Sequence, residues 1–375
     1  MSTRVRVLLA DDSVVVRRAL AKALESDPDF EVVATLANGV QALARLETTK
    51  VDAVVLDIEM PELDGLETLR RIRAKWPLLP VIMCSTLTER GATVTIEALS
   101  LGATDYVTKP AQASSYAEAL AGLREELVRK IRAVVCPTRP SIRPLRTASA
   151  PPATPPPVVA APPARQQRPE ILAIGCSTGG PNALIDFWRG IPRTFPFPIV
   201  LVQHMPPVFT RMLAERLTAL GGVPVKEGAE GERLEPGQAR IAPGGFHMEL
   251  FRQGELVKIH LHEGPPENSC RPAADVLFRS VARVYGPKAY GVVMTGMGQD
   301  ALVGSRAIVD AGGAVLAQDE ATSVVWGMPG FVARAGLARE VLPLAQLAPA
   351  VSRAFLGTAG RSDRMNPLLP PTKAA

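Results

Sequence analysis

The stretch Ile171-Leu-Ala-Ile-Gly175-Cys176-Ser177-Thr178-Gly179-Gly180 decides how the second half of this chain is expected to fold. Its apolar residues predict a buried parallel strand, and the glycines predict a sharp turn with a helix opening near Pro181. A serine in such a turn lies at the carboxyl edge of the sheet, beside backbone N–H groups. That position suits a nucleophile. The same glycines also suit phosphate binding, or close packing of the helix against the strand.

Length and composition indicate an ordinary globular protein. The chain has 375 residues, 47% hydrophobic and 21% charged, which is enough for two cores. The amino end reaches Asp11 too early for a signal peptide and no run resembles a membrane span, so we expect a cytoplasmic protein without membrane insertion. The four cysteines show no C-x-x-C spacing, which argues against a zinc site and a disulfide framework.

The positive charge and the prolines concentrate in one segment. Eight Arg and Lys residues and no acid lie between Glu126 and Glu170, and ten prolines lie between Pro137 and Pro163. The net charge of +5 therefore belongs to a connecting segment, and we expect no nucleic-acid partner. The composition predicts a semi-rigid basic linker over residues 134–168, and the last residues, 358–375, are expected to form a disordered tail.

Residues 1–133 alternate between apolar runs and helix-like segments. Strands are expected at 5–10, 31–36, 52–57, 79–85 and 105–110, and helices at 14–25, 39–47, 65–76, 92–101 and 114–133. Such βα units predict a doubly wound parallel sheet with helices on both faces. Polar residues follow the strands at the edge where ligands bind: Asp11, Asp12, Asp57, Ser85 and Lys109. Converging carboxylates favour a hard cation such as Mg²⁺.

This first domain resembles a response-regulator receiver domain, whose fold is flavodoxin-like. The resemblance is carried by Leu9-Ala-Asp11-Asp12-Ser13, Leu56-Asp57-Ile-Glu-Met-Pro61, Asp64-Gly65, Ser85, Tyr106 and Lys109-Pro110. It implies that Asp57 accepts a phosphoryl group from a CheA-type histidine kinase. It also implies Mg²⁺ on Asp12, Asp57 and the Glu59 carbonyl, with Asp11 in support. Ser85 and Tyr106 would form the switch pair, and Lys109 would contact the phosphate.

Residues 169–357 predict a second α/β domain. Besides the opening strand, strands are expected at 197–204, 239–243, 290–295 and 314–317, with a hairpin at 246–252 and 256–262. One helix is expected to begin near 181 and another to end at 311. Further helices are expected at 209–220, 272–285, 329–336 and 344–356. We therefore expect a second doubly wound, Rossmann-like parallel sheet with an antiparallel hairpin attached.

A serine nucleophile needs a base, and the base needs an orienting acid. Of the four histidines, His204 alone follows directly from a buried parallel strand, and Asp300 closes a glycine-flanked turn after another strand. Because the carboxyl ends of parallel strands meet at one edge, we expect Ser177, His204 and Asp300 to converge there. The backbone N–H groups near Thr178 and Met297 are expected to hold the oxyanion.

Other assignments remain open for the base and the acid. His247 is a minor candidate for the base and Asp319 is a rival acid. Asp300 could also act as a helix N-cap. His260 and His262 alternate along a hairpin strand and are expected to cover one face of it.

The second domain resembles the CheB-type protein-glutamate methylesterases. The resemblance is carried by Ile174-Gly-Cys-Ser177-Thr-Gly-Gly180, Val202-Gln-His204-Met-Pro206 and Met294-Thr-Gly-Met-Gly-Gln-Asp300. It implies cofactor-independent hydrolysis of glutamate methyl esters on methyl-accepting chemotaxis receptors, with glutamine deamidation, in sensory adaptation. Ala301 stands where the family usually has glycine, and Cys176 where alanine is common. The order Ser, His, Asp differs from that of α/β-hydrolases, so the G-x-S-x-G match indicates convergence.

Two further hypotheses concern regulation and alternative function. We expect the unphosphorylated receiver to pack over the catalytic edge and phospho-Asp57 to loosen that contact. The alternative from another class is a phosphorylation-switched binding protein in which Gly175–Gly180 binds a phosphate or nucleotide and no ester is cleaved. A transcriptional regulator ranks lower, because no compact helix-turn-helix follows the receiver.

Overall fold

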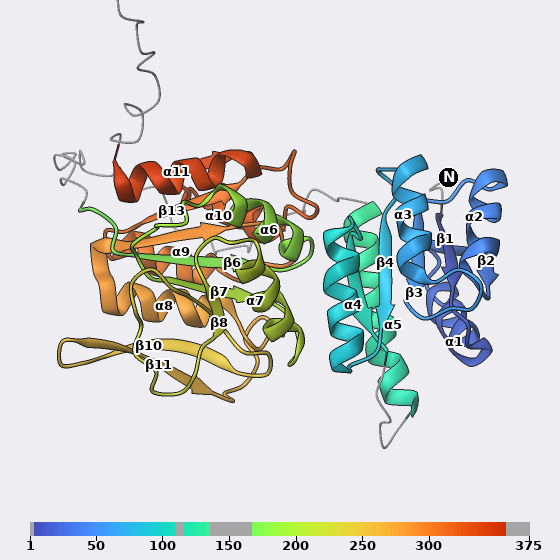
Figure 1. The fold of residues 1–375 in the computed structure, drawn as a ribbon, viewed down its shortest axis with the longest axis horizontal. Helices are drawn as coiled ribbons and strands as arrows, with labels where there is room; N and C mark the ends of the chain where they lie inside the picture. Colours follow the sequence, from blue (N-terminus) through green and yellow to red (C-terminus); the bar gives the residue numbers. More distant parts are fainter. Residues whose placement is uncertain (1–3, 110–115, 136–166, 358–375) are drawn as a thin grey trace, which may run out of the picture.

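The chain forms two parallel α/β domains that lie side by side (Figure 1). The structure is a computed structural model and describes residues 4–109, 116–135 and 167–357. Most of the expected linker over residues 134–168, and the whole expected tail over 358–375, lie outside the described residues.

The first sheet is parallel with strand order β2-β1-β3-β4-β5, the flavodoxin-like order. Its elements are β1 (Val5–Ala10), α1 (Val14–Glu25), β2 (Phe30–Leu36), α2 (Gly39–Thr48), β3 (Ala53–Asp57), α3 (Gly65–Lys75), β4 (Val81–Ser85), α4 (Glu89–Ser100), β5 (Asp105–Thr108) and α5 (Tyr116–Val135). Ser13, Asn38, Asp64 and Thr88 each accept a backbone amide at the start of helices α1 to α4. These N-caps fix where each helix begins after its loop.

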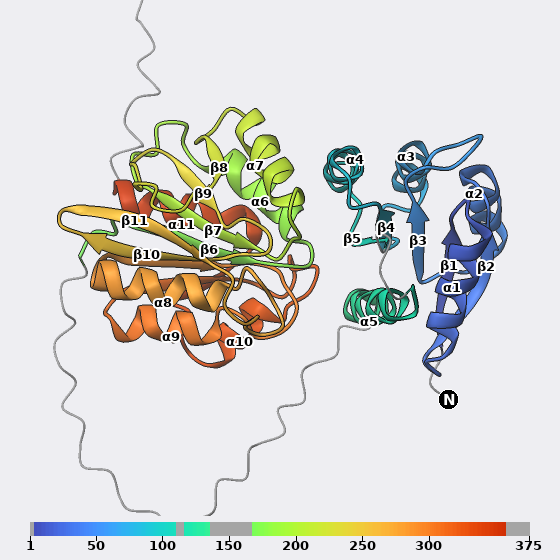
Figure 2. The ribbon, with the colours of Figure 1, turned by 90° about the horizontal axis from the view of Figure 1, so that it is seen from below.

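The second sheet is parallel with strand order β14-β13-β12-β6-β7-β9-β8. Its elements are β6 (Ile171–Cys176), α6 (Gly180–Gly190), β7 (Ile199–Gln203), α7 (Phe209–Ala219), β8 (Val225–Glu227), β9 (Ala239–Ile241), β10 (His247–Gln253), β11 (Leu256–His262), α8 (Ala274–Tyr285), β12 (Ala289–Val293), α9 (Leu302–Asp310), β13 (Ala314–Gln318), α10 (Met328–Arg334), β14 (Glu340–Leu342) and α11 (Leu344–Leu356). Helices α8 and α9 cover one face, and α6, α7 and α11 cover the other (Figure 2). The β10–β11 hairpin is antiparallel and packs against α8.

The expected fold class is confirmed in both domains, and most element ends differ from the sequence prediction by a few residues. The three-residue strands β8 and β14 and the short 3₁₀ turn Gly286–Lys288 were not predicted. Such short segments show no periodicity, so only their pairing with longer neighbours defines them.

The apolar core runs without a break from one domain to the other. On the α2–α4 side of the first sheet, buried residues such as Ile96 and Leu99 belong to the same cluster as Leu213 and Leu217 of α7. Helix α4 packs against α6 and α7. The two domains therefore share an apolar interface at the helices that follow β6 and β7.

Candidate active site

Three adjacent strands of the second sheet bring the catalytic candidates to one edge. Strand β6 lies between β12 and β7 and pairs with both in parallel. Ser177 follows β6 and His204 follows β7, while Asp300 lies in the loop between β12 and α9. These residues are far apart in the sequence, but they lie close in space because their strands are neighbours and run in the same direction.

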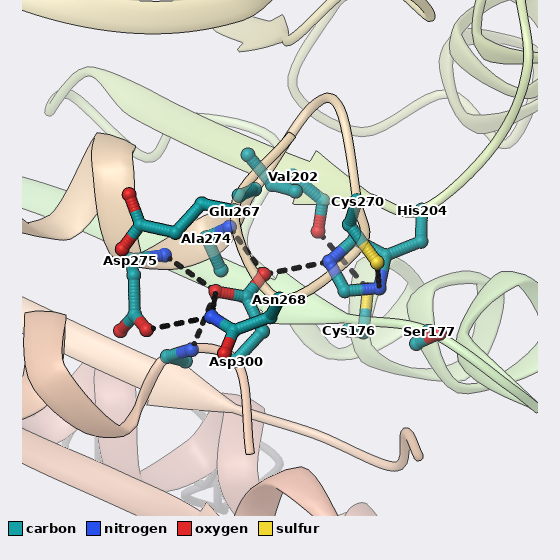
Figure 3. A network of polar contacts seen from close by, with 12 residues as sticks. Cys176, Ser177, Val202, His204, Glu267, Asn268, Cys270, Ala274, Asp275 and Asp300 are labelled. Atoms are coloured by element: carbon teal, nitrogen blue, oxygen red, sulfur yellow. Dashed lines mark hydrogen bonds and ion pairs between the residues drawn. The ribbon is translucent and has the colours of Figure 1, made fainter. Parts of the chain in front are cut away.

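His204 and Asp300 form a direct contact. The Nε2 atom of His204 lies 2.7 Å from Oδ2 of Asp300 (Figure 3). Asp300 is buried and also accepts the backbone amides of Ala274 (2.6 Å) and Asp275 (2.9 Å) at the start of α8. Burial raises the pKa of Asp300, but the hydrogen bonds from His204 and these amides outweigh burial and leave the pKa below its ordinary value.

Asp300 therefore caps a helix, but not the one that follows it in the chain. The next helix, α9, has Ala301 as its N-cap, with a φ of 75°. Helix α8 has Ala273 as its N-cap and no side-chain cap of its own, so the Asp300 carboxylate supplies that function from another loop.

The ring of His204 is held from both sides. Asp300 binds Nε2, so Nδ1 is the nitrogen available as a base, and it lies 3.4 Å from Sγ of Cys270. Burial lowers the pKa of His204, but the hydrogen bonds to Asp300 and Cys270 prevail and raise it to about 10. A carboxylate behind the imidazole stabilises the imidazolium that forms when the ring takes a proton.

Ser177 lies in the turn between β6 and α6, where its amide donates to the Thr295 carbonyl at 3.0 Å. Gly179 has a φ of 75°, and a Cβ there would lie 2.6 Å from Val324, so glycine is required in this turn. Figure 3 shows Ser177 on the loop beside His204. Among the described residues, no hydrogen bond joins the Ser177 hydroxyl to His204; Cys270 is the group at Nδ1 instead.

Two backbone amides near Ser177 are available to an oxyanion. Among the described residues, the N–H groups of Thr178 and Met297 donate to no protein acceptor. Thr178 follows Ser177 in the turn, and Met297 follows Gly296, where a Cβ would lie 2.9 Å from the Cβ of Ser177. The absence of a side chain at Gly296 lets the two loops approach closely.

The alternative candidates are occupied elsewhere. Both ring nitrogens of His247 are used by backbone groups, the carbonyl of Pro265 (3.1 Å) and the amide of Ala273 (3.2 Å). Asp319 closes its own turn by accepting from Thr322. The rings of His260 and His262 stack at 5.5 Å on the hairpin, as their spacing predicted.

Sequence reasoning missed three residues around the acid. Asn268 donates to Asp300 (3.1 Å) and to Asp275 (3.0 Å), and Asp275 accepts the Gly304 amide at the start of α9. Burial raises the pKa of Asp275 to about 6. Cys270 completes the group, and no local sequence signal points to it, because the loop that brings it to His204 has no regular pattern.

The receiver domain carries its own polar cluster at the carboxyl edge of its sheet. Carboxylate oxygens of Asp11, Asp12 and Asp57 all lie within 4.8 Å of one another. Lys109 Nζ bridges Asp11 (2.8 Å) and Asp57 (2.7 Å). Burial raises the pKa of Asp57 to about 6, against the opposing effect of Lys109. One hollow at this edge is lined by Asp12, Asp57, Glu59 and Lys109.

The two expected switch residues are placed differently. Ser85 lines the same hollow as Asp57 and Lys109. The hydroxyl of Ser85 contacts the Gly91 carbonyl (3.1 Å) and accepts from Thr95 (2.7 Å) in α4. The ring of Tyr106 stacks on Phe209, the first residue of α7, with centroids 4.8 Å apart. Tyr106 therefore lies in the contact between the domains.

Comparison with known proteins gives a consistent result along the chain. Residues 172–351 match the family model described as CheB methylesterase, and residues 7–121 match that of the response regulator receiver domain. A protein-glutamate methylesterase/protein-glutamine glutaminase of Trichodesmium erythraeum is 48% identical over 348 residues, which cover 93% of this chain and 98% of the relative. A relative of the same name from Nocardioides sp. is 46% identical over 370 residues, 99% of each chain.

The chain belongs to the CheB methylesterase family. It is thus a receiver-regulated hydrolase of a two-component chemotaxis system. The crystal structure of the Thermotoga maritima CheB methylesterase catalytic domain is 42% identical and covers 49% of this chain and 97% of that one, with a TM-score of 0.48. No helix within the described part of this CheB methylesterase is long and apolar enough to cross a membrane.

In this CheB methylesterase the receiver contacts α6 and α7, the two helices that begin beside the Ser177 and His204 loops. Asn182 in the first turn of α6 donates to the Ala103 carbonyl at 3.0 Å. On α7, Met212 accepts from Thr93 (3.2 Å) and Arg211 pairs with Glu89. Asp105, Tyr106 and Ala103 were not predicted as interface residues, because the contact depends on how two domains meet.

Proposed function

We propose that Ser177, His204 and Asp300 hydrolyse glutamate methyl esters of methyl-accepting chemotaxis receptors. The His204–Asp300 contact of 2.7 Å supports this most directly. Ser177 Oγ attacks the ester carbonyl while Nδ1 of His204 takes its proton, and Asp300 stabilises the imidazolium. The proton then passes to the departing methanol, and water releases the glutamate by the same route.

The amides of Thr178 and Met297 are proposed to hold the oxyanion of the tetrahedral intermediate. Both N–H groups lack a protein acceptor among the described residues, and Gly296 brings their loops together. A donor of this kind contributes about 10²–10³ in rate. The same chemistry with ammonia as the leaving group deamidates glutamine, and we include that activity in the proposal.

Ser177→Ala tests the nucleophile. We expect methanol release from methylated receptor to fall to background, because no other hydroxyl is proposed to attack the ester. The melting temperature should stay unchanged, since the Ser177 hydroxyl makes no hydrogen bond within the described residues. A serine-directed organophosphonate should label Ser177 in the parent protein. Methanol release by the alanine variant, or failure to label Ser177, would favour the phosphate-binding alternative.

For the receiver, we propose that Asp57 accepts a phosphoryl group in the presence of Mg²⁺. Asp12, Asp57 and the Glu59 carbonyl are proposed to hold the ion, with Asp11 in support, because oxygen donors with close carboxylates suit Mg²⁺. Bound Mg²⁺ neutralises the charge of the carboxylates and the incoming phosphoryl oxygens. Lys109, already 2.7 Å from Asp57, is positioned to contact the phosphate.

We propose that phosphorylation reaches the esterase through Ser85 and Tyr106. Ser85 touches α4, and α4 and Tyr106 contact the helices that follow the Ser177 and His204 loops. Rearrangement of Ser85 and Tyr106 on phosphorylation loosens that contact and admits the receptor. The phosphoryl donor is proposed to be a CheA-type histidine kinase.

We further propose the division of the chain into a receiver (1–133), a basic proline-rich linker (134–168), a catalytic domain (169–357) and a tail (358–375). A cytoplasmic location follows from the proposed kinase and receptor partners, and cell fractionation tests it. Limited proteolysis tests the division, with first cleavages expected within 134–168 and 358–375.

A further inference from the structure

Cys270 lies where a serine hydrolase needs its nucleophile to be. Its Sγ is 3.4 Å from Nδ1 of His204, and Nε2 of the same ring is 2.7 Å from Asp300. The three groups form a Cys–His–Asp arrangement around the base proposed to serve Ser177. Figure 3 shows the thiol next to the imidazole, while Ser177 lies on the neighbouring loop with no bond to the ring drawn.

The loop that carries Cys270 fixes this position. The backbones of Glu267 and Cys270 exchange hydrogen bonds of 3.0 and 2.9 Å, which closes a tight turn. Within the turn Asn268 and Ser269 have left-handed φ values of 53° and 62°. The Asn268 amide is bound to Asp300, so the acid holds both the base and the loop that presents the thiol. Such a conformation, disfavoured for residues other than glycine, persists only when its surroundings determine it.

Cys270 also differs from the other cysteines that the structure describes. Cys84 and Cys176 are fully buried, and burial raises the pKa of both thiols. Cys270 is partly exposed and is the thiol that touches an imidazole. Because a reagent must reach the sulfur and only Cys270 of these three is both accessible and in contact with a ring nitrogen, the reactivity of these thiols should differ.

We propose that Cys270 is a redox modification site that switches the esterase off when a hydroperoxide oxidises it. This inference rests on the proposed role of His204 as the base of Ser177. The His204 ring is charged and carries a proton on Nδ1, so the thiol proton passes to solvent and the sulfur attacks one oxygen of hydrogen peroxide. An S–O bond forms, the O–O bond breaks, and the leaving hydroxide takes the proton from Nδ1 as water. The sulfur loses two electrons and the peroxide gains them.

The product is a sulfenic acid beside His204. The reduced thiol already lies at Nδ1 as a weakly bonding group that the Ser177 hydroxyl can displace. The added oxygen makes Cys270 larger and a stronger hydrogen-bonding partner of the ring, so the Ser177 hydroxyl is kept out and ester attack is blocked. The sulfenic acid is reversible, and a dithiol reductant restores the thiol in two exchange steps. The oxidant thus acts on the catalytic centre without involving the receiver or the phosphorylation of Asp57.

Hydrogen peroxide and iodoacetamide test the proposal on the full chain. Mass spectrometry of protein with Cys136 replaced by serine follows Cys84, Cys176 and Cys270 separately. We expect Cys270 to be alkylated at least about tenfold faster than the other two, since of the three it is the one that is partly exposed and in contact with an imidazole. Peroxide should reduce methanol release in proportion to Cys270 sulfenic acid, trapped with dimedone, and dithiothreitol should restore it.

Cys270→Ser is the matched control because it removes the sulfur and keeps the size of the side chain. Its methanol release, relative to its own untreated rate, should resist peroxide. His204→Ala should slow alkylation of Cys270 by about tenfold. Should this variant unfold, urea-denatured parent protein replaces it, in which the three thiols should react alike.

Equal alkylation rates in the native protein would overturn the inference, as would full esterase activity after complete oxidation of Cys270 or peroxide sensitivity of Cys270→Ser. The alkylation rates are independent of ester hydrolysis. A protein that alkylates rapidly at Cys270 but releases no methanol when untreated would refute the proposed function and leave the reactive thiol in place.

Discussion

The side chain of Asp300 combines two functions at the residue scale. It orients His204 through Nε2, and it accepts the first amides of α8. The positive end of the helix and the hydrogen bonds together favour the ionised carboxylate. An ionised partner in turn holds a proton on the imidazole, so the pKa of His204 lies well above its ordinary value.

The pH dependence of ester hydrolysis follows from this arrangement. Nδ1 of His204 accepts a proton only when the ring is neutral, and its pKa of about 10 keeps the ring charged at neutral pH. We therefore expect kcat/KM to rise between pH 7 and pH 9, measured by methanol release in the presence of a phosphodonor. In Asp300→Asn the rise should move to lower pH while the maximal rate falls by about 10³–10⁴.

Asp310→Asn, an exposed aspartate at the end of α9, is the control and should leave the profile unchanged. A profile that is flat between pH 7 and pH 9 in the parent protein, or the same midpoint in Asp300→Asn, would contradict the assignment of the base.

At the scale of single elements, the loop entering α9 shows what the sequence can and cannot predict. The strand β12, the turn at Gly296 and the helix α9 follow from local patterns, because apolar runs and glycines act within a few residues. The capping of α8 by Asp300 and the contact of Cys270 with His204 join residues 26 and 66 positions apart in the chain. No periodicity encodes such contacts, so the candidate residues were predicted and their partners were not.

Ala301 provides a test at this scale, because it has a left-handed φ of 75° where glycine is the usual residue. Ala301→Gly relieves about 1–2 kcal/mol of backbone strain. The change also removes a buried methyl group worth about 0.8 kcal/mol and adds about 0.5–1 kcal/mol of chain entropy. We expect the free energy of unfolding to change by less than about 1 kcal/mol in urea titrations.

Ala307→Gly in the middle of α9 is the matched control. No strain is relieved there, so we expect a loss of about 1 kcal/mol or more. If Ala301→Gly destabilises the protein as much as Ala307→Gly, the left-handed residue carries no strain.

For the whole molecule, the important feature is a single apolar cluster that crosses from the receiver to the catalytic domain. At the edge of this cluster the side-chain amide of Asn182, which lies close to the Ser177 turn, donates to the Ala103 carbonyl of the receiver. Burial raises the pKa of Asp105 there, with Lys130 and the Thr178 hydroxyl acting in the opposite direction. The sequence predicted a contact over the catalytic edge but none of the residues that make it.

Tyr106→Ala tests whether this contact restrains the esterase. The variant removes the ring stacked on Phe209, so basal methanol release without a phosphodonor should rise by about fivefold or more. Stimulation by the phosphodonor should shrink accordingly. Tyr285→Ala at the end of α8 removes a comparable ring outside the interface and should leave both rates unchanged. An unaltered basal rate in Tyr106→Ala would argue against restraint through this ring.

Chelation of Mg²⁺ tests which of the two domains depends on a divalent cation. EDTA should abolish stimulation by a small phosphodonor, because phosphorylation of Asp57 is proposed to need Mg²⁺ at the Asp11, Asp12 and Asp57 carboxylates. The basal rate of methanol release should persist, since the ester chemistry is proposed to use the Ser177, His204 and Asp300 side chains and two backbone amides, and no cation. Loss of the basal rate on chelation, with recovery on adding Mg²⁺ back, would require a cation in the ester reaction.

The dual attachment of Asp300 has a consequence for how this enzyme can lose its activity. A homologue in which Asp300 is replaced also loses the cap of α8, so loss of activity by that substitution is accompanied by a loss of stability. The hydroxyl of Ser177 supports no other part of the described structure. Drift toward a silent, receptor-binding paralogue should therefore begin at the serine and keep the aspartate long after catalysis has gone.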